Sequence, residues 1–284
     1  MKKVKIIAEI GCNHLGRMDL AFKHIDSAIE NGADIIKFQK RCISEILTFE
    51  QYNAPHPHPE FSYGENYGKH REALELKIID HKILKEYIES KGKIYSTSVW
   101  DCVSSKEVIN LNPKVIKIPS ATNLNWKVHE ILCNEYKGEI QLSLGMTSKK
   151  EIEEIIRYYV KKKRNKDLVI FSCTSGYPVD FQDVCLLELV ELQRKYKGIV
   201  KDFGFSGHHL GISVDIAAYI LGANYIERHF TFDRTIVHTD ITAALGSDGL
   251  RRLVRDLEAV RLSINYKKVD ILPVEEVQRK KLKG

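Results

Sequence analysis

Eight short apolar segments alternate with helical segments along almost the whole chain, and this alternation restricts the possible folds. The apolar segments are rich in Ile and Val, which is typical of strands that are buried on both faces of a parallel sheet. We expect strands at residues 4–9, 34–39, 93–97, 115–118, 139–143, 168–173, 202–206 and 225–229.

The segments between the strands show helical spacing of apolar residues. One example holds Ile152, Ile155, Ile156 and Tyr159. Eight strand–helix units without a break in composition predict an α/β protein, a single closed (β/α)₈ or TIM barrel. The alternative is a doubly wound open sheet, which would usually need fewer strands or a second domain. No GxGxxG or GxxxxGK turn is present to bind a nucleotide.

The helix–strand spacing divides the chain into a catalytic barrel at residues 1–265 and a C-terminal tail at residues 266–284. The connection from about residue 40 to residue 76 is too long for a simple link between a strand and a helix. It contains a Pro-His-Pro-His-Pro run at residues 55–59. Long ordered connections in compact domains are often lids or binding loops, and we expect a lid here.

Charge and cysteine content narrow the class of protein. The net charge is +6, but the basic residues are spread over predicted helix faces, so we expect no nucleic-acid partner. A modestly positive protein suits small anionic substrates. No apolar run reaches the roughly 20 residues that span a bilayer, and we expect no membrane association and no signal peptide. Six scattered cysteines without a CxxC pair predict reduced thiols and a cytoplasmic location.

Polar residues recur at the C-terminal ends of the predicted strands, where TIM barrels place their active sites. Two ammonium groups with several hydroxyls there suit a ligand that carries a phosphate and a carboxylate. The alternative is that these residues only cap strand ends. The candidates are Lys37, Thr97, Lys117, Ser120, Ser143, Ser175 and Ser206.

Two histidines, His208 and His229, end neighbouring strands, so their imidazoles could converge on one point. Two histidines together with oxygen ligands suit a first-row divalent cation such as Mn²⁺ or Zn²⁺. Glu9 and Asp240 are candidate carboxylates for direct or water-mediated contact with the cation. The alternative is that both histidines are ordinary polar residues.

The segments that carry these residues resemble the sialic acid synthase (N-acetylneuraminate synthase) family. The matching motifs run nearly from end to end and keep their order at the strand ends. They are AEIGCNH at 8–14, IKFQ at 36–39, YST at 95–97, IKIPS at 116–120, LSLGM at 142–146, CTSGYP at 173–178, GFSGH at 204–208 and IERHFT at 226–231.

The resemblance implies a metal-dependent condensation of phosphoenolpyruvate with an N-acylated amino-sugar aldehyde. The products would be phosphate and a nonulosonic acid, which is a sialic-acid-like 3-deoxy-2-keto acid. The family's pattern places Mn²⁺ on His208 and His229, Glu9 beside the metal or its water, and Asp240 near the metal and the sugar. We assign catalytic roles to Glu9, Lys37, Lys117 and Asp240, and substrate binding to Asn13, Gln39, Thr97, Ser120, Thr122, Ser143, Ser175 and Ser206.

The chain departs from the family's pattern on the sugar side. Thr122 stands where many members carry a glutamate, and Gly207 stands where many carry an aspartate. The usual Pro-Gly-Pro-Asp reads Val-His-Thr-Asp at residues 237–240. We also expect no antifreeze-like C-terminal domain after the barrel. These departures predict a retained reaction on an altered sugar. The resemblance also leaves open a homodimer and a separate chain that supplies that domain.

Three other functions stay open. The same chemistry could act on another aldose or an aldose phosphate, as in the related octulosonate and heptulosonate phosphate synthases. A metal-dependent aldolase would need no phosphoenolpyruvate. A non-catalytic sensor or partner subunit is the third possibility, and the complete set of candidate metal and anion ligands argues against it.

Overall fold

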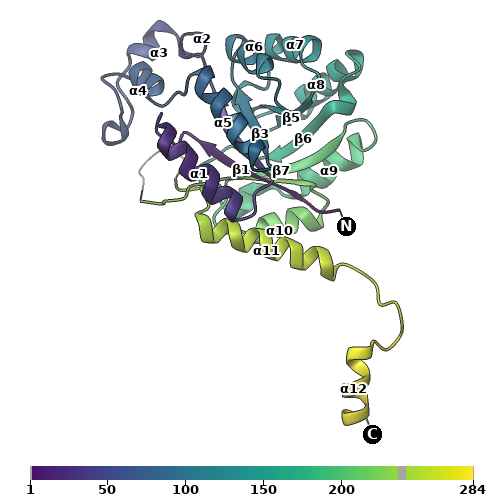
Figure 1. The fold of residues 1–284 in the computed structure, drawn as a ribbon. Coiled ribbons are helices and arrows are strands. Elements are labelled where there is room, and N and C mark those ends of the chain that lie inside the picture. The colour runs from purple at the N-terminus through teal and green to yellow at the C-terminus, as the bar shows by residue number, and fades with distance from the viewer. Residues whose placement is uncertain (1, 236–240, 284) are drawn as a thin grey trace.

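The computed structural model describes residues 2–235 and 241–283, and its eight strands close into one parallel barrel (Figure 1). Each strand pairs with the next along the chain, and the last pairs with the first. The predicted TIM barrel is confirmed, and the doubly wound open sheet is excluded. The strands are β1 (Lys5–Gly11), β2 (Ile35–Lys40), β3 (Ile94–Val99), β4 (Val115–Ile118), β5 (Glu139–Ser143), β6 (Leu168–Cys173), β7 (Asp202–Gly207) and β8 (Tyr225–His229).

One long helix follows each strand and covers the outside of the barrel (Figure 1). In α8, the Ser148 side chain caps the first turn in a capping box with Glu151, while Ile155, Ile156 and Tyr159 are buried against the sheet. The helices are α1 (Met18–Glu30), α5 (Ile78–Ser90), α6 (Cys102–Asn110), α7 (Trp126–Glu135), α8 (Lys149–Lys161), α9 (Leu187–Tyr196), α10 (Ser213–Ile220) and α11 (Ser247–Ser263).

Side-chain alternation along the strands gives the barrel two cores and a polar end. Residues that face outward, such as Ile36 and Phe38, join the large core beneath the helices. Residues that face inward near the strand starts form a small apolar core of Ile7, Ile35, Val169, Phe171 and Tyr225. The next inward positions toward the strand ends are Glu9, Lys37, Cys173 and Glu227, so the same alternation places charge above the inner core.

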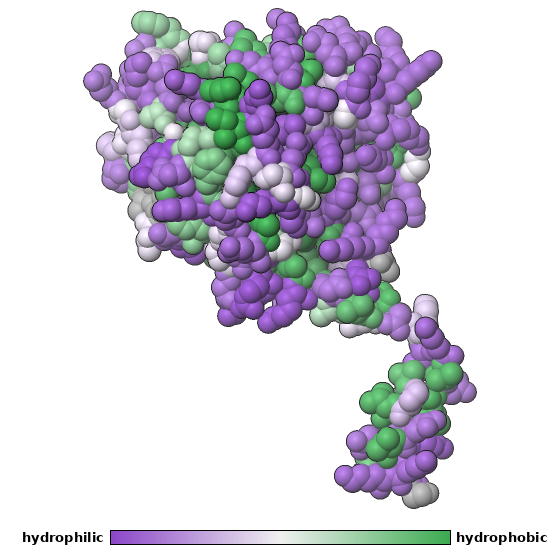
Figure 2. Space-filling view, in the orientation of Figure 1, coloured by the Kyte–Doolittle hydropathy of each residue, from purple (hydrophilic) through white to green (hydrophobic). Residues whose placement is uncertain are grey.

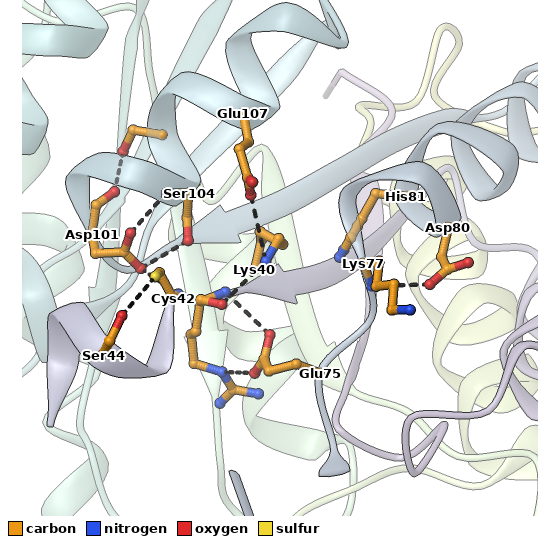
Figure 3. A network of polar contacts seen from close by, with 12 residues as sticks. Lys40, Cys42, Ser44, Glu75, Lys77, Asp80, His81, Asp101, Ser104 and Glu107 are labelled. Atoms are coloured by element: carbon orange, nitrogen blue, oxygen red, sulfur yellow. Dashed lines mark hydrogen bonds and ion pairs between the residues drawn. The ribbon is translucent and has the colours of Figure 1, made fainter. Parts of the chain in front are cut away.

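The long connection after β2 is folded rather than extended. It contains α2 (Ile43–Ile46), α3 (Phe49–Asn53), the 3₁₀ helix η1 (Pro59–Phe61) and α4 (Tyr67–Ala73). The end of α4 packs on the turn after β1 so closely that a Cβ at Gly16 would lie 2.1 Å from the Ala73 carbonyl oxygen. The start of the segment is tied to the loop after β3, where the Cys42 amide donates to Asp101 at 2.8 Å (Figure 3).

The C-terminal tail contains one more helix, α12 (Pro273–Leu282), which stands away from the barrel (Figure 1). Its apolar side chains are uncovered, with Val274 at 75% and Leu282 at 73% exposure (Figure 2). Within the described residues, none of the helices has the length and apolar character needed to cross a membrane.

Candidate active site

A cavity of about 320 Å³ opens at the C-terminal end of the strands and gathers most of the predicted site residues. They come from seven of the eight strands or the turns that directly follow, as expected for a TIM-barrel active site. The predicted residues that line the cavity are Glu9, Lys37, Gln39, Lys117, Ser120, Ser143, Ser175, Ser206, His208 and His229.

Ser98 lines the cavity on β3, and Thr97 does not. Thr97 lies between Ser96 and Ser98 on the strand, so it faces the helix layer with the core residues Tyr95 and Val99. The Lys37 ammonium donates to the Ser98 hydroxyl at 3.0 Å. The sequence therefore identified the correct strand, but the hydroxyl that lines the cavity belongs to Ser98 and not to Thr97.

Three further predicted residues are not placed in the cavity. Asn13 is fully buried and donates to the Phe230 carbonyl at 2.6 Å, which ties the turn after β1 to the end of β8. Thr122 lines a neighbouring groove together with Trp100 and Trp126. Asp240 lies outside the described residues, and its expected place near the metal and sugar stays a prediction.

Two lysines and two carboxylates form the floor of the cavity. Lys37 pairs with Glu9 and lies 3.5 Å from Glu227, while Lys117 pairs with Glu227 at 3.0 Å. Glu227 also accepts from the Ser206 hydroxyl at 2.9 Å. All four charged side chains are buried, and their two positive and two negative charges cancel. The floor is therefore a neutral, hydrogen-bonded network rather than a pair of free cations.

The network shifts the pKa values of its members. Burial tends to lower the pKa of Lys37, but the Glu227 and Glu9 carboxylates outweigh burial and raise it. Burial lowers the pKa of Lys117 to about 8, against the effect of Glu227 and with the help of the Lys37 charge. Burial alone would raise the pKa of Glu227, yet the two lysines lower it well below its usual value. Glu227 is therefore ionised at neutral pH.

The sequence did not identify Glu227, although a signal was available. Glu227 lies two residues before His229 on the same strand, so both side chains face the barrel interior. Arg41 and Arg71 also line the cavity and were missed. They belong to the connection after β2, where no strand period indicates which side chains turn inward.

Close approach of the loops brings the serine hydroxyls together. The Ser120 hydroxyl accepts from the Gly145 amide at 3.1 Å. A Cβ at Gly145 would lie 2.4 Å from the Ser175 hydroxyl and 2.7 Å from that of Ser120, so a side chain at this position would displace both. Gly145 thus allows the loop after β5 to meet its neighbours.

His208 and His229 do converge at the mouth of the cavity, with ring centroids 5.5 Å apart. Nδ1 of His208 lies 3.0 Å from the Thr174 carbonyl oxygen, an arrangement that orients the ring and leaves Nε2 as its ligand nitrogen. Burial and the neighbouring His229 lower the pKa of His208 to about 3, so its imidazole is neutral, as metal binding requires. Tyr177 packs against His208 at 4.5 Å between ring centroids.

The two imidazoles fit a divalent cation that takes its remaining ligands from water or substrate. Across residues 2–235 and 241–283, no group of three His, Cys, Asp or Glu residues has the geometry to hold a metal. Glu9 is engaged by Lys37 and by Gln39, whose amide donates to it at 2.7 Å. A first-row cation bound by two histidines would keep several open positions.

A second buried network holds the histidine loops from behind. Arg228 lies between Glu227 and His229 in the sequence, so its side chain points away from the cavity. It donates to Asp215 at 2.5 Å. It also donates to the His209 carbonyl at 2.6 Å. Arg228 directly precedes His229, and His209 directly follows His208. The network therefore ties together the two backbone segments that carry the histidine pair.

The fold and the cavity define a TIM barrel with a polar site at the C-terminal ends of its strands. The chain belongs to the NeuB family, whose model matches residues 24–268. It is 32% identical over 277 residues to the human N-acetylneuraminate-9-phosphate synthase. This match covers 98% of this chain and 76% of the human protein. It is also 32% identical over 264 residues to the N,N'-diacetyllegionaminic acid synthase of Campylobacter jejuni, covering 92% of this chain and 77% of that protein.

A solved structure agrees with this family assignment. The N-acetylneuraminic acid synthetase of Leptospira borgpetersenii in complex with citrate superposes with a TM-score of 0.81 at 27% identity. The match covers 99% of this chain and 93% of that chain. The resemblance seen in the sequence is thereby confirmed at the level of the family.

Replacing Glu227 by Gln should leave two buried lysines with one carboxylate. We expect the thermal unfolding midpoint to fall and the free energy of unfolding to decrease by about 3 kcal/mol or more. The reason is that breaking a buried ion pair leaves its remaining partner uncompensated. Added inorganic phosphate should restore more stability to this variant than to the wild-type protein, since a bound anion replaces the negative charge that Lys117 has lost.

Glu153→Gln is the matched control, because Glu153 and its partner Lys195 are both nearly half exposed. This variant should unfold like the wild-type protein, with or without phosphate. A Glu227→Gln protein as stable as the wild type, or one indifferent to phosphate, would show that the floor is not a balanced charge network.

Proposed function

We propose that the protein condenses phosphoenolpyruvate with an N-acylated amino-sugar aldehyde to give phosphate and a nonulosonic acid. The observation that carries this proposal is one cavity in which two buried lysines, five serines and a pair of histidines meet. The names of the relatives support it, because they are synthases of N-acetylneuraminic, legionaminic and pseudaminic acids.

Phosphoenolpyruvate binds above the floor in this account. Lys37 and Lys117 supply the charges for its phosphate and carboxylate, and the hydroxyls of Ser120, Ser143 and Ser175 donate hydrogen bonds. The Ser206 hydroxyl lines the same cavity and donates to Glu227. The anion raises the pKa of Lys117 and keeps it protonated. The bound molecule is thus positioned with its methylene carbon toward the mouth, and positioning alone can remove several kcal/mol from the barrier.

The bond changes follow from that position. The methylene carbon attacks the aldehyde carbon, positive charge develops at the enol carbon, and water adds there. Phosphate then leaves by cleavage of its C–O bond. Glu9 is our candidate to orient the water, because Gln39 and Lys37 hold its carboxylate in place.

We propose that His208 and His229 hold a divalent cation, with Mn²⁺ as the first choice. Such a cation supplies Lewis-acid polarisation of the aldehyde oxygen. The neutral state of His208 and its orientation by the Thr174 carbonyl support this role. Asp240 stays the predicted carboxylate near the metal and the sugar.

We further propose a cytoplasmic enzyme, supported by six cysteines that form no disulfide. A homodimer, and a separate chain that supplies the family's C-terminal domain, stay predictions. The same site could also accept another aldose or an aldose phosphate. A metal-dependent aldolase that uses pyruvate is the less favoured alternative, because pyruvate carries a carboxylate but no phosphate and so needs fewer cationic groups than the two lysines of this cavity.

Substituting Lys117 by Met should lower kcat/KM for phosphoenolpyruvate by about 100-fold or more, because a buried charge aimed at the substrate is lost. The assay is phosphate release with N-acetylmannosamine and Mn²⁺. Lys149→Met is the control, since that side chain is 81% exposed, and it should not change the rate. Carbon–carbon bond formation from pyruvate without phosphate release would instead establish an aldolase.

The affinity of the free protein for phosphoenolpyruvate should depend on pH through Lys117. A lysine is charged below its pKa and neutral above it, so the association constant should fall by about tenfold per unit above pH 8. Lys117→Arg keeps its charge and should move this fall to higher pH. Calorimetric titration of both proteins from pH 7 to 9.5 measures this dependence, and a flat wild-type profile would contradict it.

A further inference from the structure

The neutral floor leaves a charge requirement that the two lysines do not meet alone. A phosphate monoester carries a charge of about −1.5 to −2 at neutral pH, and the carboxylate of phosphoenolpyruvate adds one more. Lys37 and Lys117 are already balanced by Glu9 and Glu227. Additional positive charge in the cavity must therefore come from elsewhere. The cation proposed at His208 and His229 serves the aldehyde oxygen, and two arginines line the wall of the cavity.

The first of these arginines, Arg41, is already fully engaged. It pairs with the Glu75 carboxylate and donates to the Cys12 sulfur at 2.7 Å. Its guanidinium also lies over the Trp100 ring, 5.3 Å from the ring centroid. Arg41 thus ties the start of the connection after β2 to its end. Figure 3 shows Glu75 beside Lys40, which pairs with Glu107, and Cys42, whose amide is bound by Asp101.

The second arginine, Arg71 on α4, has no such carboxylate partner in the described part of the chain. Glu72 is bound by Lys69 at 2.9 Å and by the Tyr52 hydroxyl at 2.9 Å. Glu75 is bound by Arg41. The nearby acidic side chains that could neutralise Arg71 are therefore taken.

The position of Arg71 is nevertheless well defined. Its guanidinium lies 6.0 Å from the centroid of the Tyr67 ring, one helical turn earlier. The Asn66 side chain caps α4 by accepting from the Lys69 amide. A Cβ at Gly68 would lie 2.2 Å from the Tyr52 ring, so α3 and α4 touch through that glycine. The helix thus presents an uncompensated guanidinium to the cavity from an ordered support.

We propose that Arg71 is an anion-binding residue that contacts a phosphate group from the loop side of the cavity. A guanidinium binds phosphate with two parallel hydrogen bonds, which gives orientation as well as charge. The phosphate belongs either to phosphoenolpyruvate or to a phosphorylated sugar aldehyde. This inference rests on the proposed function and names the substrate group that the loop side of the site recognises.

The test compares Arg71→Met with Arg255→Met, which removes an exposed arginine on α11. Phosphate release is measured with N-acetylmannosamine and with its 6-phosphate, while phosphoenolpyruvate is varied in turn. We expect Arg71→Met to raise one KM by about 10- to 100-fold, the usual effect of losing hydrogen bonds to a charged group. The KM of the Arg71→Lys variant should lie between those of the wild type and Arg71→Met, because lysine keeps the positive charge but lacks the paired N–H donors of the guanidinium.

The affected substrate identifies the phosphate. A higher KM for phosphoenolpyruvate with both sugars assigns the phosphate to phosphoenolpyruvate. A higher KM for the 6-phosphate alone, with loss of any preference for it, assigns the phosphate to the sugar. If Arg71→Met behaves like Arg255→Met with every substrate, the inference is overturned while the proposed function stands.

Failure of the proposed function would look different. The wild-type protein would then release no phosphate with either sugar. In that case calorimetric binding of inorganic phosphate to the wild-type and Arg71→Met proteins decides the role of Arg71. Tighter binding by the wild type supports an anion site at Arg71, and equal binding overturns it.

Discussion

The ion pair between Lys117 and Glu227 spans the interior of the barrel, and the site depends on it. Lys117 comes from β4 and Glu227 from β8, strands on opposite sides of an eight-stranded barrel. Glu227 also faces Lys37, which in turn pairs with Glu9. Each of these charges alone would be costly to bury, and together they form a floor that the inner apolar core supports from below.

Charge balance explains how the floor and the loops share the work of binding. In the proposed function, substrate anions would enter a network whose charges already cancel, so further positive charge would have to come from above the floor. The barrel supplies the lysines and hydroxyls at the strand ends. The connection after β2 supplies Arg71, and the histidine pair offers a place for a cation. The proposed function thus divides catalytic and recognition roles between rigid strands and folded loops.

Much of this arrangement follows from the sequence because strands have a simple period. The eight strands were predicted to within two residues at each end, and ten predicted site residues line one cavity. A period of two also explains the error at Thr97, where a shift of one residue exchanges the cavity face for the helix face. The same period would have revealed Glu227.

The loop residues could not be placed by the same reasoning. Whether Arg41 or Arg71 turns toward the cavity depends on how three short helices pack, and no local pattern encodes that packing. Thr122 was expected beside the sugar from its place after Ser120, but the 3₁₀ turn of η2 (Ser120–Thr122) directs it to the neighbouring groove. Asn13 was expected to bind substrate and instead closes the turn after β1.

The most direct test of the central claim follows the oxygen that bridges carbon and phosphorus in phosphoenolpyruvate. The wild-type protein is incubated with Mn²⁺, N-acetylmannosamine and phosphoenolpyruvate labelled with ¹⁸O at that position, and both products are examined by mass spectrometry. The account predicts a nonulosonic acid without the label and phosphate that carries it. Label retained in the keto acid, or no phosphate released with any sugar aldehyde, would contradict it.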